Sequence, residues 1–485
     1  MASKKTRRVV TAIKLSSLRS EIGAWRAIAA SDAFSIHRTQ LEDVCQSLEV
    51  LYTRLAESLP ASAGDDDTLD QADADRFDTQ LLGAFRIWEF YRSKFALRLV
   101  EPLRTELAPF DELAWQAYQP ARNRAVASGV VHHVARREPP LVFTTPERSA
   151  FARPHGFGYE IDETGAGEDA TALFDDILRT LPVPLIGVPH YQLAHLPHGI
   201  VVAHEAGHLV EDDFDLTGEL QTGIADALRA AAAGSVDETL EERIAAWSIR
   251  WRSETFADVY AVLVGGPAYA DVLLGMIDAE PSIVAEERQP DLHRAGSRWS
   301  TYPTRALRAL VVCEAVRQLA DSASEPAGFA ALADTAYGGW AARHPTHAMT
   351  AYERDVPHVV RALMHTPLRA FKQGAERKPI VDVVSFTPQM DRRARRLAVD
   401  ANGGIVINSN SVRTLFAAAV YAFSIDPDAF AQCGLARFQK NLQKISGLEV
   451  RDASAPLSVK DRDKRHAAIG QRLYERLVQD GRRSE

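Results

Sequence analysis

The chain of 485 residues is long enough for more than one domain, and its content of 46% hydrophobic and 25% charged residues is typical of a globular protein. A net charge of −9 at pH 7 lacks the strong basic excess of a general nucleic-acid-binding protein, so we expect no nucleic-acid partner. The three cysteines stand far apart, which argues against a cysteine zinc site or a disulfide framework: Cys45, Cys313 and Cys433.

The sequence contains no segment that is typical of a secretion signal or a membrane span. The basic start is not followed by an apolar stretch of signal-peptide length. The most apolar span, residues 255–277, contains Asp258, Asp271 and a Gly-Gly-Pro break, which favour two buried helices joined by a turn. We therefore expect a cytoplasmic protein without a membrane partner.

The first 135 residues are predicted to be helical. Apolar side chains recur at helical spacing over residues 8–58 and again over 77–125. Between these stretches lies an acidic run that includes Asp65, Asp66 and Asp67. It lacks the glycine and the closing glutamate of a calcium-binding loop, so we interpret it as a solvated connection.

The pattern changes near residue 139, where short strands become the better interpretation. Residues 139–145 and 183–189 are each predicted to form a strand, with glycine-rich turns at 153–161 and a helix at 170–180 between them. Prolines cannot donate a hydrogen bond to a sheet, and the second strand contains two of them. We therefore expect residues 183–189 to form an edge strand.

Helices dominate the rest of the chain. One is predicted around residues 204–213, a long one over 238–264, and further helices beyond Pro281. The last region is expected to hold a strand at 380–386, an apolar helix at 412–423 and a charged helix at the end of the chain. The predicted fold class is therefore mainly α (α+β), with a zincin-like core that carries a small sheet between helical flanks. The expected divisions are 1–135, 136–375 and 376–485.

The sequence His204-Glu-Ala-Gly-His208 is the strongest chemical signal in the chain. Histidines four apart project from one face of a helix and can share a metal ion, and Glu205 is placed to act on a water bound there. The same residues on a surface helix could simply be solvated. The apolar flanks argue otherwise, because they predict a buried helix in which polar side chains need partners.

A third ligand is predicted from a second helix. The metzincin spacing fails, since Glu211 and Phe214 stand where that pattern needs glycine and histidine. In the stretch 247–258, Glu254 can complete the metal site, and Asp258 can accept the free N–H of a metal-bound histidine. As ordinary surface acids, two carboxylates four apart would repel each other on a helix.

The two motifs together resemble the gluzincin metallopeptidases, which combine HExxH with a downstream ExxxD or ExxAD helix. The resemblance covers the two helices and extends at most over residues 180–310. It implies that His204, His208 and Glu254 bind Zn²⁺, that Glu205 is the general base and that Asp258 supports a ligand. The gap between the motifs is similar to that of CAAX-processing and heat-shock membrane proteases, although the transmembrane helices of those proteins are absent.

The resemblance also implies a downstream side chain that stabilises the oxyanion of the transition state. Tyr302 and His293 are the preferred candidates, and Arg305 lies in the same stretch. The segment 343–347 is a further candidate. The loop histidines before the site helix could line a cleft or be merely solvated: His190, His195 and His198.

These observations predict a zinc-dependent peptidase that acts on a protein or peptide substrate, with Glu205 as general base and restricted endopeptidase action. In gluzincins, a strand close to the zinc helix pairs with extended peptide, and residues 183–188 are expected to do so here. Two alternatives stay open: a non-catalytic zinc-binding sensor that retains the fold, and a helical interaction protein without metal.

Overall fold

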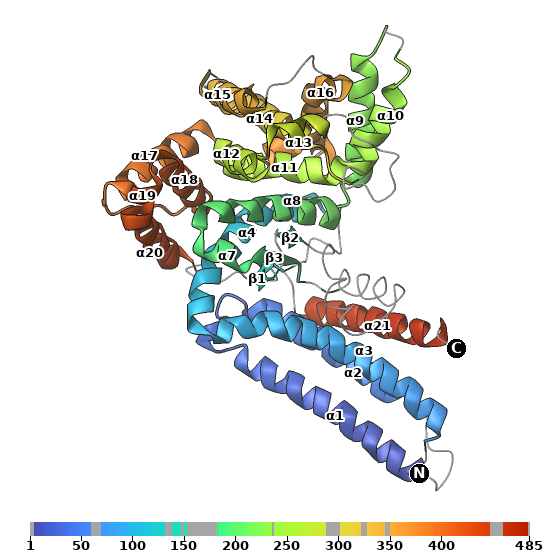
Figure 1. The fold of residues 1–485 in the computed structure, drawn as a ribbon. Helices are drawn as coiled ribbons and strands as arrows, with labels where there is room; N and C mark the ends of the chain where they lie inside the picture. Colours follow the sequence, from blue (N-terminus) through green and yellow to red (C-terminus); the bar gives the residue numbers. More distant parts are fainter. Residues whose placement is uncertain are drawn as a thin grey trace.

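The computed structural model describes residues 4–59, 69–130, 138–146, 150–152, 181, 183–234, 237–287, 301–321, 327–344, 350–446 and 459–483. These residues form a mainly helical protein with two small sheets, which confirms the predicted fold class at this level (Figure 1). None of the described helices is long and apolar enough to cross a membrane. The predicted turns at 153–161, the helix at 170–180, His293 and the acidic residues 60–68 lie outside the described residues.

Four helices form an elongated N-terminal unit, in which apolar positions at helical spacing build a core of their own. Trp88, Tyr52 and Phe95 are among its fully buried side chains. The final helix of the chain packs beside the first ones, as Figure 1 shows in red against blue. The helices are α1 (Lys4–Ile28), α2 (Arg38–Ser58), α3 (Gln71–Ala96) and α21 (Val459–Arg483).

A three-stranded sheet follows the long helix α4 (Glu101–Ser128). Its strands are β1 (Leu141–Thr145), β2 (Phe151–Ala152) and β3 (Leu185–Pro189), in the order β1-β3-β2. β3 pairs in parallel with β1 and antiparallel with β2, so the prediction that it forms an edge strand was wrong.

The prolines that suggested an edge strand lie where they cost the sheet little. Pro184 precedes β3 and accepts a hydrogen bond from the N–H of Leu141 at 2.9 Å, while Pro189 is the last residue of the strand. The N–H groups between them remain available for pairing on both sides. Among the described strands, β1 and β2 are therefore the outer ones.

The segment after β3 carries the chain directly into the first site helix. It passes through α7 (His190–Ala194) and the 3₁₀ turn η4 (Leu196–Val201) into α8 (Val202–Asp213), which ends where the sequence predicted. Every residue of α8 except Asp212 is buried.

The second site helix begins with an irregular turn. The predicted helix 238–264 comprises α10 (Leu240–Ala245), a π-helical turn η5 (Ala246–Arg250) and α11 (Arg252–Gly265). π turns insert an extra residue and are frequent at functional sites. Here the turn lies immediately before the helix that carries Glu254, so it sets the direction in which that side chain points.

The remaining helices enclose this pair. Those above or beside α11 in Figure 1 are α9 (Thr217–Ala231), α12 (Pro267–Met276), α13 (Pro281–Glu286), α14 (Arg305–Asp321), α15 (Ala327–Arg343) and α16 (Ala351–His365). Those at the side are α17 (Pro388–Asn402), α18 (Val412–Ile425), α19 (Pro427–Ala429), the π turn η8 (Phe430–Gly434) and α20 (Leu435–Ile445).

The prediction of a strand at residues 380–386 was wrong. The second sheet is a hairpin of β4 (Leu368–Gln373) and β5 (Glu376–Lys378), and a 3₁₀ turn, η7 (Ile380–Asp382), follows it. Ile380, Val381 and Val384 are buried, a spacing that suits a helical turn better than the alternation of a half-buried strand.

The C-terminal helices are tied to α11 through a partly buried arginine. The Arg413 side chain donates hydrogen bonds to the backbone carbonyls of Leu263, Val264 and Ser385 at 2.8, 2.8 and 3.0 Å. The carbonyls at the end of a helix have no partner inside it, so a cation placed there satisfies them and complements the helix dipole. Both regions also share one hydrophobic core.

The two site helices cross at Gly207. A Cβ atom at this position would lie 2.9 Å from the Cα of Ala257 and 3.1 Å from the Cβ of Tyr260. These contacts are shorter than packed carbon atoms tolerate, and one of them is with rigid backbone. The glycine therefore permits the close approach that brings the polar side chains of α8 and α11 together.

We predict that Gly207→Ala lowers the free energy of unfolding by about 1–3 kcal/mol, because the added methyl group overpacks the crossing. Gly275→Ala on α12 is the matched control, since nothing lies within 4 Å of a Cβ there. Alanine favours the helix at that position, so the control should be neutral or slightly stabilising. Urea unfolding of the three proteins tests this, and equal midpoints would contradict a close crossing.

Candidate metal centre

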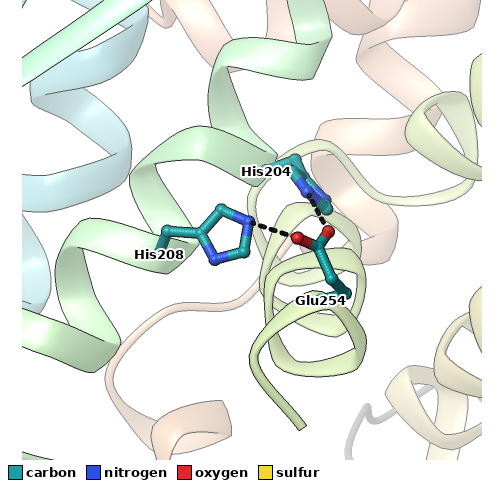
Figure 2. Close-up of side chains that lie close together, drawn as sticks. All are labelled: His204, His208 and Glu254. Atoms are coloured by element: carbon teal, nitrogen blue, oxygen red, sulfur yellow. Dashed lines mark ion pairs between the residues drawn. The ribbon is translucent and has the colours of Figure 1, made fainter. Parts of the chain in front are cut away.

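Three buried side chains from two helices converge on one point. α8 presents His204 and His208 one turn apart, and α11 presents Glu254 opposite them (Figure 2). The Nε2 atom of His204 lies 3.3 Å from one carboxylate oxygen of Glu254, and the Nε2 atom of His208 lies 3.7 Å from the other. The ligand atoms of all three residues lie within 4.8 Å of one another.

These separations fit one tetrahedral metal ion. Zinc binds imidazole nitrogen and carboxylate oxygen at about 2.0–2.2 Å, which places neighbouring ligand atoms of a tetrahedron roughly 3.3–3.6 Å apart. The observed 3.3 and 3.7 Å, which are measured to the two different oxygens of Glu254, are close to this spacing. A set of two imidazoles and one carboxylate suits zinc and also other divalent transition ions.

Asp258 fixes the orientation of His204 from behind. The Nδ1 atom of His204 lies 2.9 Å from Oδ1 of Asp258, so a proton on Nδ1 leaves Nε2 with a free lone pair that faces the cluster. The Asp258 carboxylate also accepts hydrogen bonds from the Tyr269 hydroxyl at 2.7 Å and from two nitrogens of Arg308 at 2.8 Å each. A tyrosine, an arginine and a histidine therefore hold this carboxylate in place.

His208 has a support of its own. Its Nδ1 atom lies 3.0 Å from the hydroxyl oxygen of Ser253, the residue before Glu254. One turn further along α8, Glu211 forms an ion pair with Arg252 of α11. The two helices are thus joined on both sides of the metal-ligand cluster by polar contacts between consecutive turns.

The surrounding charges favour a cation in this pocket. Burial lowers the pKa of the His204 imidazole, but hydrogen bonds to Asp258 and Glu254 outweigh it and raise the pKa to about 10. Burial also lowers the pKa of His208, yet the Glu254 charge produces a net rise. Conversely, burial alone would raise the pKa of Glu254, whereas the two imidazoles hold it well below its usual range.

The carboxylates outnumber the guanidinium groups in the pocket. Glu205, Glu254 and Asp258 are all buried, and Arg308 balances Asp258 through the paired contacts described above. The carboxyl groups of Glu205 and Glu254 then remain beside the two imidazoles of His204 and His208. Buried charges are costly unless they are paired or coordinate a metal, so a divalent cation would satisfy this arrangement.

Glu205 lies beside the ligand cluster without belonging to it. Burial raises the pKa of its carboxyl group, and the charges of His204, His208 and Glu254 act on it as well, which places it in the same pocket. No described residue forms a hydrogen bond with its carboxylate. This side chain is therefore available for a ligand or a water molecule.

Tyr302 is the one oxyanion candidate that the structure places at the cluster. Burial, followed by the charges of Glu254 and Glu205, raises the pKa of its hydroxyl to about 12, which places this hydroxyl close to the cluster. With 40% of its surface exposed, the tyrosine reaches both the solvent and the ligands. His293 lies outside the described residues, so its position stays a prediction.

The other sequence candidates have partners elsewhere. Arg305 forms an ion pair with Glu287. His344, within the 343–347 segment, lies 2.6 Å from Asp278, and its ring packs at a tilt against Trp340. The rings of His195 and His198 pack against each other, and His195 also packs against Phe423 of α18. His190 is exposed on α7.

Sequence reasoning missed three residues that shape the site: Ser253, Tyr269 and Arg308. Arg308 had a visible signal, because it is a lone charge in the apolar run Ala306–Val312. A buried arginine needs a carboxylate, and Asp258 was the acid without a predicted cation. Ser253 and Tyr269 had no comparable signal, since serines and tyrosines pack in many cores.

Comparisons with known proteins identify no relative. No family model matches the chain, and neither the curated proteins nor the solved structures contain a significant match.

We predict that Asp258→Asn lowers zinc affinity about 10–100-fold, because the amide no longer fixes the proton on Nδ1 of His204. Asp355→Asn is the matched control, since Asp355 is likewise buried and paired with an arginine, Arg243, outside the cluster. Competition with a zinc-binding dye measures the affinity. Equal losses in both variants would show that general destabilisation is responsible.

Proposed function

We propose that this protein is a zinc-dependent peptidase in which His204, His208 and Glu254 bind the metal ion and Glu205 is the general base. The observation that carries the proposal is the meeting of these four side chains in one buried pocket. Their geometry fits a zinc site, and a carboxylate beside it without a protein partner suits proton transfer.

The ligand number supports an enzyme rather than a structural site. Structural zinc sites are closed by four protein ligands, whereas catalytic sites use three and keep one position open. Within the described part of the chain, no further His, Cys, Asp or Glu joins the cluster of His204, His208 and Glu254. This favours catalysis over the alternative of a zinc-binding sensor that retains the fold.

Each residue of the site has a separate role in the proposed reaction. When bound, the zinc ion supplies a Lewis acid that makes water acidic enough to lose a proton near neutral pH. Glu205 takes a proton from the attacking water and passes it to the amine that leaves. Tyr302, the exposed hydroxyl beside Glu254, donates a hydrogen bond to the oxygen on which negative charge develops.

Asp258, Tyr269 and Arg308 act through His204. They hold its ring so that Nε2 keeps a fixed direction while charge moves in the pocket. A preorganised site avoids rearrangement during the reaction, which is the main source of electrostatic catalysis. The buried helices around α8 and α11 provide the rigid frame for this arrangement.

The sheet supports a peptide as substrate. β2 is an outer strand among the described ones and contacts α8, so its backbone is the better candidate for pairing with an extended peptide than the central β3. Backbone pairing needs no particular side chain, which suits endopeptidase action on protein segments. We therefore propose that β2 (Phe151–Ala152) pairs with the peptide, in place of residues 183–188, for which the sequence predicted this role.

We predict that Glu205→Gln retains zinc but hydrolyses peptides about 10²–10⁴-fold more slowly, because the amide cannot accept a proton. His204→Ala is the comparison, since it removes a ligand and should lose zinc and activity together. Metal analysis and cleavage of a peptide library measure both properties.

Profiling of new protein N-termini in cells that express wild type or Glu205→Gln would then identify substrates. Equal turnover of the two proteins would refute the mechanism.

We predict that Tyr302→Phe lowers kcat about 10²–10³-fold with little change in KM, since the lost hydrogen bond acts on the transition state. Tyr474→Phe, at a tyrosine that packs on the N-terminal unit, should leave both constants unchanged. Steady-state kinetics on one peptide compares the variants. A raised KM with unchanged kcat would instead assign Tyr302 to substrate binding.

A further inference from the structure

Residues 403–410, which we call the 405 loop, join α17 to α18 at the side of the molecule (Figure 1). The loop exposes apolar side chains: Val406 is 77% exposed and Ile405 is 56% exposed, and Val399 near the end of α17 is 61% exposed. The N–H of Ile405 donates a hydrogen bond to the carbonyl of Asp400 at 2.8 Å, across a glycine with positive φ. A helix end of this kind folds the residue after the glycine back against the last turn, so Ile405 and Val399 belong to one apolar patch.

Side chains of two helices anchor the 405 loop at both of its ends. The carboxamide of Asn441 on α20 donates to the carbonyl of Ser409 at 3.0 Å and accepts from the N–H of the same residue at 2.9 Å. Arg393 of α17 donates to the carbonyl of Asn408 at 2.7 Å, and Arg437 of α20 donates to the carbonyl of Gly404 at 2.9 Å. The loop backbone is therefore positioned by the protein itself, which lowers the entropic cost of binding a partner.

Between these anchors, the loop backbone has unused hydrogen-bonding groups. Exposed and buried residues alternate over 406–410, as they do along a strand that has one face in solvent. Within the part of the chain that the structure describes, the N–H groups of Val406, Ile407 and Asn408 donate to no protein acceptor. The edge of a sheet offers free backbone groups of this kind to an added strand.

Exposed cations from two helices surround the loop. Arg392 and Arg396 of α17 are exposed and stand four apart, on the helix face that includes Val399. On α20, Lys440 and Lys444 are exposed and lie on the side from which that helix contacts the loop. Neither of these lysines, nor Arg396, forms an ion pair with a residue that the structure describes.

The charge of this region is opposite to that of the whole protein. Residues 388–446 contain eight basic and four acidic side chains, whereas the chain has a net charge of −9. Of the four acids, Asp391 is buried in an ion pair and Asp426 caps α19, which leaves Asp400 and Asp428 against the cations. The exposed charge around the loop is therefore mostly positive and suits an acidic partner.

We propose that the 405 loop is a docking site for an extended acidic segment of another protein, which pairs with the loop backbone and places its carboxylates beside the surrounding arginines and lysines. Apolar side chains of the segment cover Ile405 and Val406. A peptide backbone can satisfy the free N–H groups, whereas the acyl chains of a membrane cannot. The exposed patch is aliphatic, whereas single-stranded nucleic acids are held by stacking on aromatic rings. This binding site goes beyond the proposed peptidase and does not depend on it.

Binding of a synthetic peptide tests the docking site. The probe is a fluorescent peptide of alternating valine and threonine with aspartates at both ends. The protein is full-length Glu205→Gln, so that binding is measured by fluorescence anisotropy without cleavage. A second peptide of the same sequence carries N-methyl groups on its central amides, which removes backbone donors without a change in charge. This second peptide should bind about tenfold more weakly or worse, because it loses the backbone hydrogen bonds of an added strand.

The lysines of α20 test the role of charge. Lys440→Glu combined with Lys444→Glu should weaken binding of the probe about tenfold or more, because the acidic peptide then meets like charges. Lys372→Glu combined with Lys464→Glu makes the same change in net charge at exposed lysines of β4 and α21, and it should leave the affinity almost unchanged. Higher salt should weaken binding of the probe to the parent protein, since exposed charges are screened.

The apolar patch and the backbone have tests of their own. Val406→Asp should weaken the probe about tenfold or more through like charge and lost apolar contact, whereas Val9→Asp, at an exposed valine of α1, should not. Hydrogen exchange of the amides of residues 406–408 should slow when the probe binds and should not slow with the N-methylated peptide.

Four results would overturn the proposal: no binding of the probe, equal binding of the two peptides, equal losses in the α20 lysine variant and its control, or binding of phosphatidylserine vesicles in place of the peptide. The measurements require no hydrolysis. A protein that cleaves no peptide can therefore still show the docking site, and failure of the proposed peptidase is distinguishable from failure of this inference.

Discussion

The structure depends on the close approach of two helices at Gly207. Ligands from separate helices can share one metal ion only when the helix backbones lie near enough for short side chains to meet. The ring of His204, the ring of His208 and the carboxylate of Glu254 reach across this crossing with little freedom left. The apolar packing of α8 and α11 is therefore the first requirement of the site, and the polar contacts act within the geometry that it sets.

The second requirement is that buried charge be balanced. Asp258 is almost fully buried, and an isolated carboxylate there would destabilise the fold. Arg308, Tyr269 and His204 share its oxygens, so the cost is offset while the direction of the histidine is fixed. The same contacts that stabilise the protein locally also leave Nε2 of His204 facing the ligand cluster. Stability and site geometry are thus properties of one hydrogen-bonded group.

Much of this arrangement could be predicted from the sequence, because it rests on local spacing. Histidines four apart share a helix face, and the pair Glu254 and Asp258 follows the same rule on the next helix. The prediction of β3 as an edge strand failed because Pro184 and Pro189 lie at its ends, where a missing N–H costs no pairing. The prediction of a strand at 380–386 failed because the buried apolar residues of this segment follow a helical spacing. Contacts such as Asp258 with Arg308 depend on how helices pack, which spacing alone does not determine.

Two buried glutamates lie at opposite ends of one structural path. At one end, Glu205 faces the ligand cluster; at the other, Glu138 lies three residues before β1. Both side chains are buried, and burial raises the pKa of each carboxyl group. The β1–β3 pair and the turns that lead into α8 connect the two places covalently and by backbone hydrogen bonds. A change at the start of β1 would therefore reach the proposed catalytic helix through that sheet.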